Sequence, residues 1–90
     1  MKPLIIRRVV GHSMEPTLHE GQLVMASGLL PVRSGDVVVA KIGDLELIKR
    51  LAVLPDNQRI LAGDNKTDNH DLAWNDETHI IGKVFWPVIF

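Results

Sequence analysis

A lysine and a serine stand in this sequence where their surroundings could make them reactive. The run from Leu45 to Val53 alternates along a predicted strand, and one of its faces carries Leu45, Leu47, Lys49, Leu51 and Val53. Lys49 is the one charged residue on this more apolar face. Burial disfavours the charged form of an amine, and a neutral amine can serve as a general base. The alternative is that Lys49 lays its stem on the sheet and keeps its ammonium group in water.

The candidate partner of this lysine is Ser13. It lies in the segment Gly11-His12-Ser13-Met14-Glu15-Pro16-Thr17-Leu18, directly after a glycine that ends a predicted strand. Glycine permits unusual backbone angles, so a carbonyl group could approach the amide and the hydroxyl of Ser13 together. A serine needs a nearby base to take its proton. Taken alone, a Gly-x-Ser turn is usually only a loop.

The elements that must position these two residues are predicted to be strands. Apolar residues alternate or run continuously in residues 4–10, 23–26, 37–42, 45–54, 59–62 and 80–90. One helical turn is expected at Met14–Leu18, where Ser13 would cap it. The polar stretch 63–78 is long for a loop in a small domain, and such loops are often functional. The sequence therefore predicts a mainly β, barrel-like fold with at most one short helical turn after the serine.

The clearest strand pair is a hairpin around Gly43-Asp44, a two-residue loop of the primed-turn type. This loop sets a register in which Val38 faces Lys49 and Lys41 faces Glu46. The second pair brings opposite charges together across the strands. The register also predicts that Lys49 points away from both charged residues.

Length and composition narrow the class of protein. Ninety residues predict a single domain, residues 1–90, and a net charge of −1 argues against a nucleic-acid partner. The absence of cysteine excludes disulfides and thiol chemistry. No metal and no cofactor are expected, because His12, His19, His70 and His79 lack paired spacing and Lys66 interrupts the calcium-like Asp64, Asp68 and Asp71. With no apolar run long enough to span a membrane and no secretory signal, the expected location is cytoplasmic.

Five segments resemble the signal peptidase I superfamily (S24/S26), the Ser/Lys-dyad proteases that include the self-cleaving repressor C-terminal domains. Residues 11–18 are similar to the nucleophile box, Gly-x-Ser-Met-x-Pro-Thr-Leu, and residues 47–51 to the box that supplies the lysine. Residues 35–39, 63–65 and 80–84 match the other boxes in the family's order. The resemblance implies the small twisted β-barrel of that family.

By this resemblance Ser13 is the nucleophile, Lys49 is the general base, and the amide of Ser13 gives one oxyanion donor. Gly11, Met14, Asp64 and Asn65 would complete the oxyanion and substrate-binding region. Some relatives carry a hydroxyl two residues before the nucleophile, where this chain has Gly11. The last box also departs, because Asn69, Leu72 and Ala73 stand where the family often has serine, serine and arginine.

The implied function is an endopeptidase that cleaves a precursor or leader peptide of a protein substrate after small residues. Only twelve residues precede Ser13, so cleavage of the chain by itself is not expected. In size the chain resembles small anchorless relatives, the proteases assigned to maturation of nickel-type superoxide dismutase. The apolar residues 85–90 predict a core or edge strand, with peripheral membrane contact or a dimer seam as alternatives. The oligomeric state stays open.

A different class of function also fits the sequence. The departures at Gly11, Asn69, Leu72 and Ala73 are compatible with a catalytically weak or inactive β-barrel module that binds a protein segment without cutting it.

Overall fold

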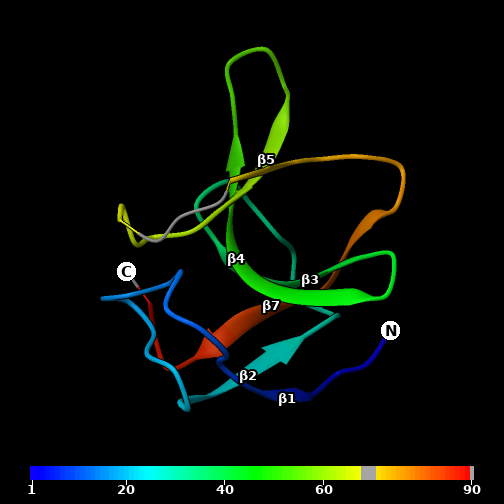
Figure 1. The fold of residues 1–90 in the computed structure, drawn as a ribbon. Coiled ribbons are helices and arrows are strands. Elements are labelled where there is room, and N and C mark those ends of the chain that lie inside the picture. The colour runs from blue at the N-terminus through cyan, green and yellow to red at the C-terminus, as the bar shows by residue number, and fades with distance from the viewer. Residues whose placement is uncertain (68–70, 90) are drawn as a thin grey trace.

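The computed structural model describes residues 1–67 and 71–89, which form one curled antiparallel sheet. Its strands are β1 (Ile5–Arg8), β2 (Leu23–Ser27), β3 (Val37–Ile42), β4 (Leu45–Val53), β5 (Arg59–Ala62), β6 (Leu72–Ala73) and β7 (Thr78–Trp86). Their order in the sheet is β1-β2-β7-β3-β4-β5-β6. Figure 1 shows the sheet bending along β4, so that it closes into a half-barrel above β1 and β2. The predicted mainly β, barrel-like fold is confirmed.

The strand bounds differ from the predicted ones mainly at the ends of the chain. β1 is shorter than residues 4–10, although the amide of Val9 still donates to the carbonyl of Gln22 at 2.8 Å. β7 starts two residues early, at Thr78, and ends at Trp86 because Pro87 has no N–H to donate. The two residues of β6 fall inside the stretch that was expected to be a loop.

The described residues contain no helix. After Ser13 the amide of Leu18 donates to the carbonyl of Met14 at 2.9 Å, which closes a single turn and no more. This agrees with the expected limit of one helical turn. No helix of the described residues is long and apolar enough to cross a membrane.

The hairpin of β3 and β4 has the predicted register, with Val38 opposite Lys49 and Lys41 opposite Glu46. Lys41 and Glu46 lie side by side as expected, but no ion pair forms between them among the described residues. The carboxylate of Glu46 instead binds Nε of Arg7 at 2.8 Å, because the curl of the sheet brings β1 against this end of β4.

The core consists of two clusters on opposite faces of β3. The first holds Ile5, Val9, Met14, Leu18, Val24, Ala26, Val37, Val39 and Val84. The second holds Val38, Ala40, Leu51 and Leu61. β3 is thus buried on both faces from Val37 to Ala40, which explains the unbroken run of apolar residues in this part of the strand. Lys49, opposite Val38, lies on the face of the second cluster.

We expect Leu61→Ala to lower the free energy of unfolding by about 2–5 kcal/mol, because it leaves a cavity in the second cluster. Leu61 is 0 % exposed. The matched control is Leu45→Ala, since Leu45 is 59 % exposed and its truncation should change stability by less than about 0.5 kcal/mol. Denaturant titration measures both, and equal losses in the two variants would contradict this account of the core.

Candidate active site

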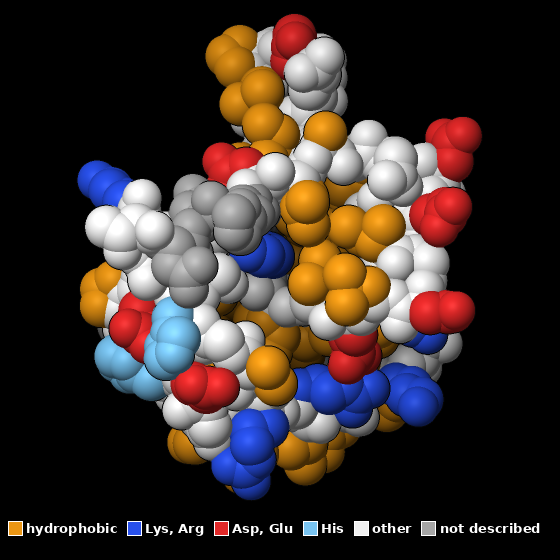
Figure 2. Space-filling model, in the orientation of Figure 1, with side chains coloured by type: hydrophobic (Ala, Val, Ile, Leu, Met, Phe, Trp, Pro, Cys, Tyr) orange, Lys and Arg blue, Asp and Glu red, His pale blue; other side chains and the backbone are white. Residues whose placement is uncertain are grey.

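The two candidate catalytic residues line one cleft between β1 and β4. The cleft has a volume of about 320 Å³ and is bounded by the end of β1 with the turn that follows it, and by the first half of β4. Its lining residues are Arg7, Arg8, Val9, Val10, Ser13, Met14, Leu45, Glu46, Leu47, Ile48 and Lys49. Figure 2 shows the same face of the molecule, with hydrophobic side chains gathered around a hollow near its middle. Serine and lysine, far apart in sequence, therefore share one site.

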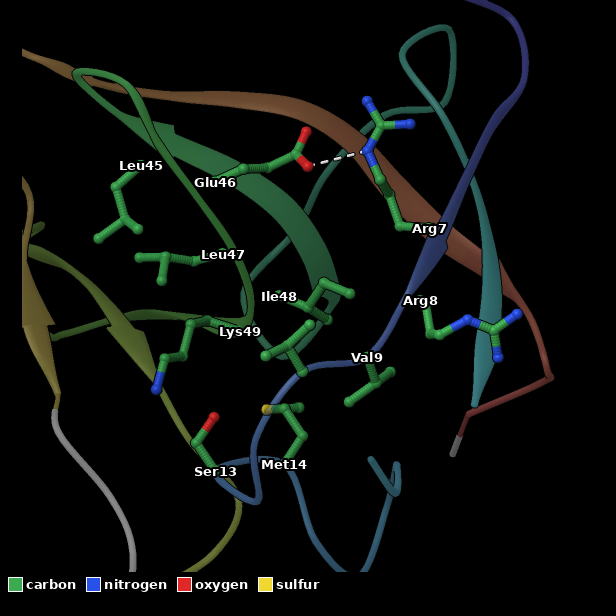
Figure 3. A pocket seen from close by; sticks show the side chains of 11 residues that line it. Arg7, Arg8, Val9, Ser13, Met14, Leu45, Glu46, Leu47, Ile48 and Lys49 are labelled. Atoms are coloured by element: carbon green, nitrogen blue, oxygen red, sulfur yellow. Dashed lines mark hydrogen bonds and ion pairs between the residues drawn. The ribbon is translucent and has the colours of Figure 1, made fainter. Parts of the chain in front are cut away.

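Lys49 is buried with only 6 % of its surface exposed. Its amine points toward the hydroxyl of Ser13 and away from Glu46 (Figure 3). The predicted alternation of β4 produces this placement, because Lys49 shares its face with Leu47 and the buried Leu51 while Glu46 lies on the other face. The stem of Lys49 is thus buried on the sheet, as both interpretations of this lysine predict.

Ser13 lies in a turn that leaves β1 at Gly11. The φ angle of Gly11 is 81°, in the left-handed region that glycine adopts without strain. Two residues of the turn then anchor it in the first core cluster, because Met14 is 1 % exposed and Leu18 is 0 % exposed. Between these fixed points Ser13 remains half-buried at the cleft, with its hydroxyl directed toward Lys49 (Figure 3). We call residues 11–18 the serine turn.

The backbone of the serine turn is held from the loop after β5. The side-chain amide of Asn65 donates to the carbonyl of His12 at 2.9 Å, and the backbone amide of Asn65 donates to the carbonyl of Ser13 at 2.8 Å. The carbonyls of His12 and Ser13 are therefore both bound by one residue, which fixes the orientation of the peptide units around Ser13.

The neighbouring Asp64 joins the serine turn to β4. Arg50 donates to its carboxylate from Nε at 2.8 Å and from a terminal nitrogen at 2.7 Å, and the hydroxyl of Thr17 donates to the same group. Hydrogen bonding from Arg50 holds the pKa of Asp64 below its usual range, aided by Thr17 and opposed by partial burial. Arg50 directly follows Lys49, so this ion pair connects the strand of the candidate base with the turn of the candidate nucleophile.

The structure separates the predicted site residues into two groups. Ser13, Lys49 and Met14 line the cleft, whereas Gly11 only shapes the turn beside it. Asp64 and Asn65 are not among the residues that line the cleft. Both form hydrogen bonds with the serine turn, so they help to hold it in position. Their expected role in oxyanion or substrate binding stays a prediction.

The departures in the last box have a partial structural explanation. Leu72 and Ala73 form β6, where they pair with Leu61 and Ile60 of β5, and Leu72 packs against the second core cluster. Asn69, like Asp68 and His70, lies outside the described residues. Within the described part of the chain, no group of three His, Asp or Glu side chains is placed to hold a metal ion.

Sequence reasoning missed four residues around the site: Arg7, Glu46, Thr17 and Arg50. For Arg50 a signal was present, since it follows the candidate base and must point to the opposite face of β4. Glu46 was considered only with Lys41, its neighbour across the hairpin. Nothing local in the sequence indicates that Thr17 reaches Asp64 or that Arg7 reaches Glu46.

Comparison with known proteins identifies the family of this chain. The family model described as Peptidase S24-like matches residues 2–85, so the chain belongs to this family of peptidases. Signal peptidase I from Streptococcus pneumoniae serotype 4 (strain ATCC BAA-334 / TIGR4) is 35 % identical over 74 residues, which are 73 % of this chain. Signal peptidase I from S. pneumoniae strain ATCC BAA-255 / R6 gives the same values. The match spans 36 % of either relative, about a third of its length.

We expect Asp64→Asn to lower the free energy of unfolding at neutral pH by about 1–3 kcal/mol, the usual range for hydrogen bonds to a charged group. A carboxyl whose pKa is lowered by folding stabilises the protein above its unfolded pKa, and this stabilisation is lost as pH falls through the folded value. The difference between wild type and Asp64→Asn should therefore be largest near pH 7 and should vanish in acid.

Urea titrations between pH 2 and pH 7 measure this difference. Asp76→Asn is the matched control, because Asp76 is exposed and its replacement should have little effect at any pH. A loss of stability in Asp64→Asn that is independent of pH would contradict the ionised pair.

Proposed function

We propose that this domain is a serine endopeptidase in which Ser13 is the nucleophile and Lys49 is the general base. The observation that carries the proposal is the buried side chain of Lys49, whose amine faces the Ser13 hydroxyl across the cleft (Figure 3). Membership of a peptidase family supports the same reaction class.

The proposed reaction runs through an acyl-enzyme. Neutral Lys49 takes the proton of the Ser13 hydroxyl while its oxygen attacks the substrate carbonyl. The backbone amide of Ser13 donates to the oxyanion that forms, and protonated Lys49 then gives its proton to the leaving amine. Water hydrolyses the ester in a second step, in which Lys49 again serves as base.

The proposed oxyanion hole has few hydrogen-bond donors. Gly11 offers no side-chain hydroxyl, so stabilisation of the oxyanion rests on backbone amides and water. Removal of one donor from such a hole typically costs about 10²–10³ in rate. We therefore propose a slow enzyme, which suits a processing reaction better than bulk degradation.

The proposed substrate is a protein segment in extended conformation. β1 is an edge strand of the sheet, and residues 45–49 of β4 pair only with β3 among the described residues. Two strand edges with unused backbone groups thus border the cleft, and such edges bind extended peptides by adding a strand. Carried over from signal peptidase I, the substrate class is a precursor or leader peptide cut after small residues, as in maturation proteases of this superfamily.

A second candidate is a module that binds such a segment without cleaving it. The specific observation in its favour is β6, where Leu72 and Ala73 pair with β5 in place of the polar residues that relatives often carry.

We expect both Ser13→Ala and Lys49→Met to abolish cleavage of a peptide library, assayed by mass spectrometry of the products. Lys49→Met should leave the fold intact and raise Tm slightly, because it removes an amine from apolar surroundings. Wild type is the positive control, and circular dichroism checks the fold of each variant. Unfolding of Lys49→Met would show that Lys49 is needed for the fold. Cleavage by Ser13→Ala would show that Ser13 is not the nucleophile.

We also expect kcat/KM to rise with pH, because Lys49 acts as base only after losing its proton. His12 adjoins Ser13, but its ring nitrogens lie 2.6 Å from Glu15 and 3.2 Å from Glu20, turned to carboxylates. His12→Gln should therefore retain most activity and the same pH profile. A profile that rises near pH ~6.5, the ordinary range of histidine, and disappears in His12→Gln would assign the base to His12.

A further inference from the structure

The end of the cleft away from Ser13 and Lys49 is crossed by an ion pair. Nε of Arg7, on β1, lies 2.8 Å from a carboxylate oxygen of Glu46, on β4 (Figure 3). Both side chains line the cleft and are partly exposed, at 38 % for Arg7 and 32 % for Glu46. This pair joins the two strand edges between which a substrate would lie.

The position of the pair along the cleft corresponds to a definite part of a bound peptide. Glu46 precedes Lys49 by three residues in β4, and an extended strand advances about 3.3 Å per residue. An extended peptide with its reacting carbonyl at Ser13 would therefore place a side chain about 10 Å away beside Arg7 and Glu46. That side chain belongs to the second to fourth residue from the reacting bond.

Arg7 and Glu46 are the charged side chains that meet at this end of the cleft. Arg8 also lines the cleft, but its guanidinium donates to the carbonyl of Gly21 and lies away from Glu46 (Figure 3). Figure 2 shows lysine and arginine side chains gathered along the lower edge of this face, next to an acidic one. Partly exposed ion pairs contribute little to stability, so a substrate group can exchange with one partner at small cost.

This end of the cleft would bind an acidic and a basic substrate side chain differently. A carboxylate can bind the guanidinium of Arg7, which retains donors beyond those used by Glu46 and by the carbonyl of Ile6. A lysine or arginine would face the like charge of Arg7 and would have to displace it from Glu46.

We propose that Arg7 and Glu46 are specificity-determining residues that favour an acidic substrate side chain two to four residues from the cleaved bond. Arg7 attracts the substrate carboxylate. Glu46 weakens this preference, because it already binds the guanidinium of Arg7. This assignment rests on the proposed peptidase function.

The test uses capped dodecapeptides of alanine, serine and valine with a central Ala–Ala bond. Aspartate or lysine is placed at the second, third or fourth position on either side of this bond. Cleavage gives the ratio of kcat/KM for the aspartate and lysine peptides, and fluorescence anisotropy gives the same ratio for affinity in the Ser13→Ala background. At one position we expect wild type to prefer aspartate by about threefold to tenfold, the effect of one partly exposed charge contact.

Two variants should move this ratio in opposite directions. Arg7→Gln should bring it close to one, and Glu46→Gln should raise it because Arg7 is released for the substrate. Arg59→Gln is the matched control, since it removes one positive charge from β5, where Arg59 stacks 4.0 Å above the ring of Trp74. It should leave the ratio unchanged.

The outcomes separate this proposal from the proposed function. Equal ratios in wild type, Arg7→Gln and Glu46→Gln at every position, or no measurable affinity for any peptide, would overturn the specificity assignment. An aspartate preference in affinity that depends on Arg7, without cleavage by wild type, would support the specificity assignment and overturn the peptidase function alone.

Discussion

The carboxylate of Asp64 is the contact on which the rest of the site depends. It receives two hydrogen bonds from Arg50 and one from Thr17, so one side chain ties the strand of Lys49 to the turn of Ser13. Without this connection the serine turn would be fastened mainly by Met14 and Leu18 in the core and by the two bonds from Asn65. The proposed dyad requires its two elements to keep a fixed relative position, and an ion pair that spans both elements restricts their movement.

The buried lysine exacts a cost in stability that the surrounding core must offset. Lys49 lies opposite Val38 and on the face of Leu51, so its stem is buried against the core, and its amine points away from Glu46. In a domain of ninety residues, whose core is small, burial of a lysine side chain lowers the stability of the fold. β3 is buried on both faces, and its apolar contacts hold β4 in place despite the buried lysine. Retaining a group that weakens the fold is typical of functional sites.

Much of the fold and part of the site could be predicted from local patterns. The Gly43-Asp44 loop and the alternation of β4 were enough to set the hairpin register and to place Lys49 on the apolar face, because both are properties of adjacent residues. The contacts of Arg7 with Glu46 and of Thr17 with Asp64 could not be predicted in this way. They depend on how far the sheet curls, which brings β1 against β4 although three strands, β2, β7 and β3, lie between them in the sheet. β6 was missed because two residues are too few to show a period.

The most direct test of the central claim is covalent labelling of the dyad. Wild type, Ser13→Ala and Lys49→Met are incubated with a phosphonate or β-lactam acylating probe, and the modified residue is located by mass spectrometry of the intact protein and its peptides. The account predicts one adduct on Ser13 in wild type, none in Ser13→Ala, and strongly slowed labelling in folded Lys49→Met. Labelling at another residue, or unmodified wild type at alkaline pH when the probe is active, would contradict it.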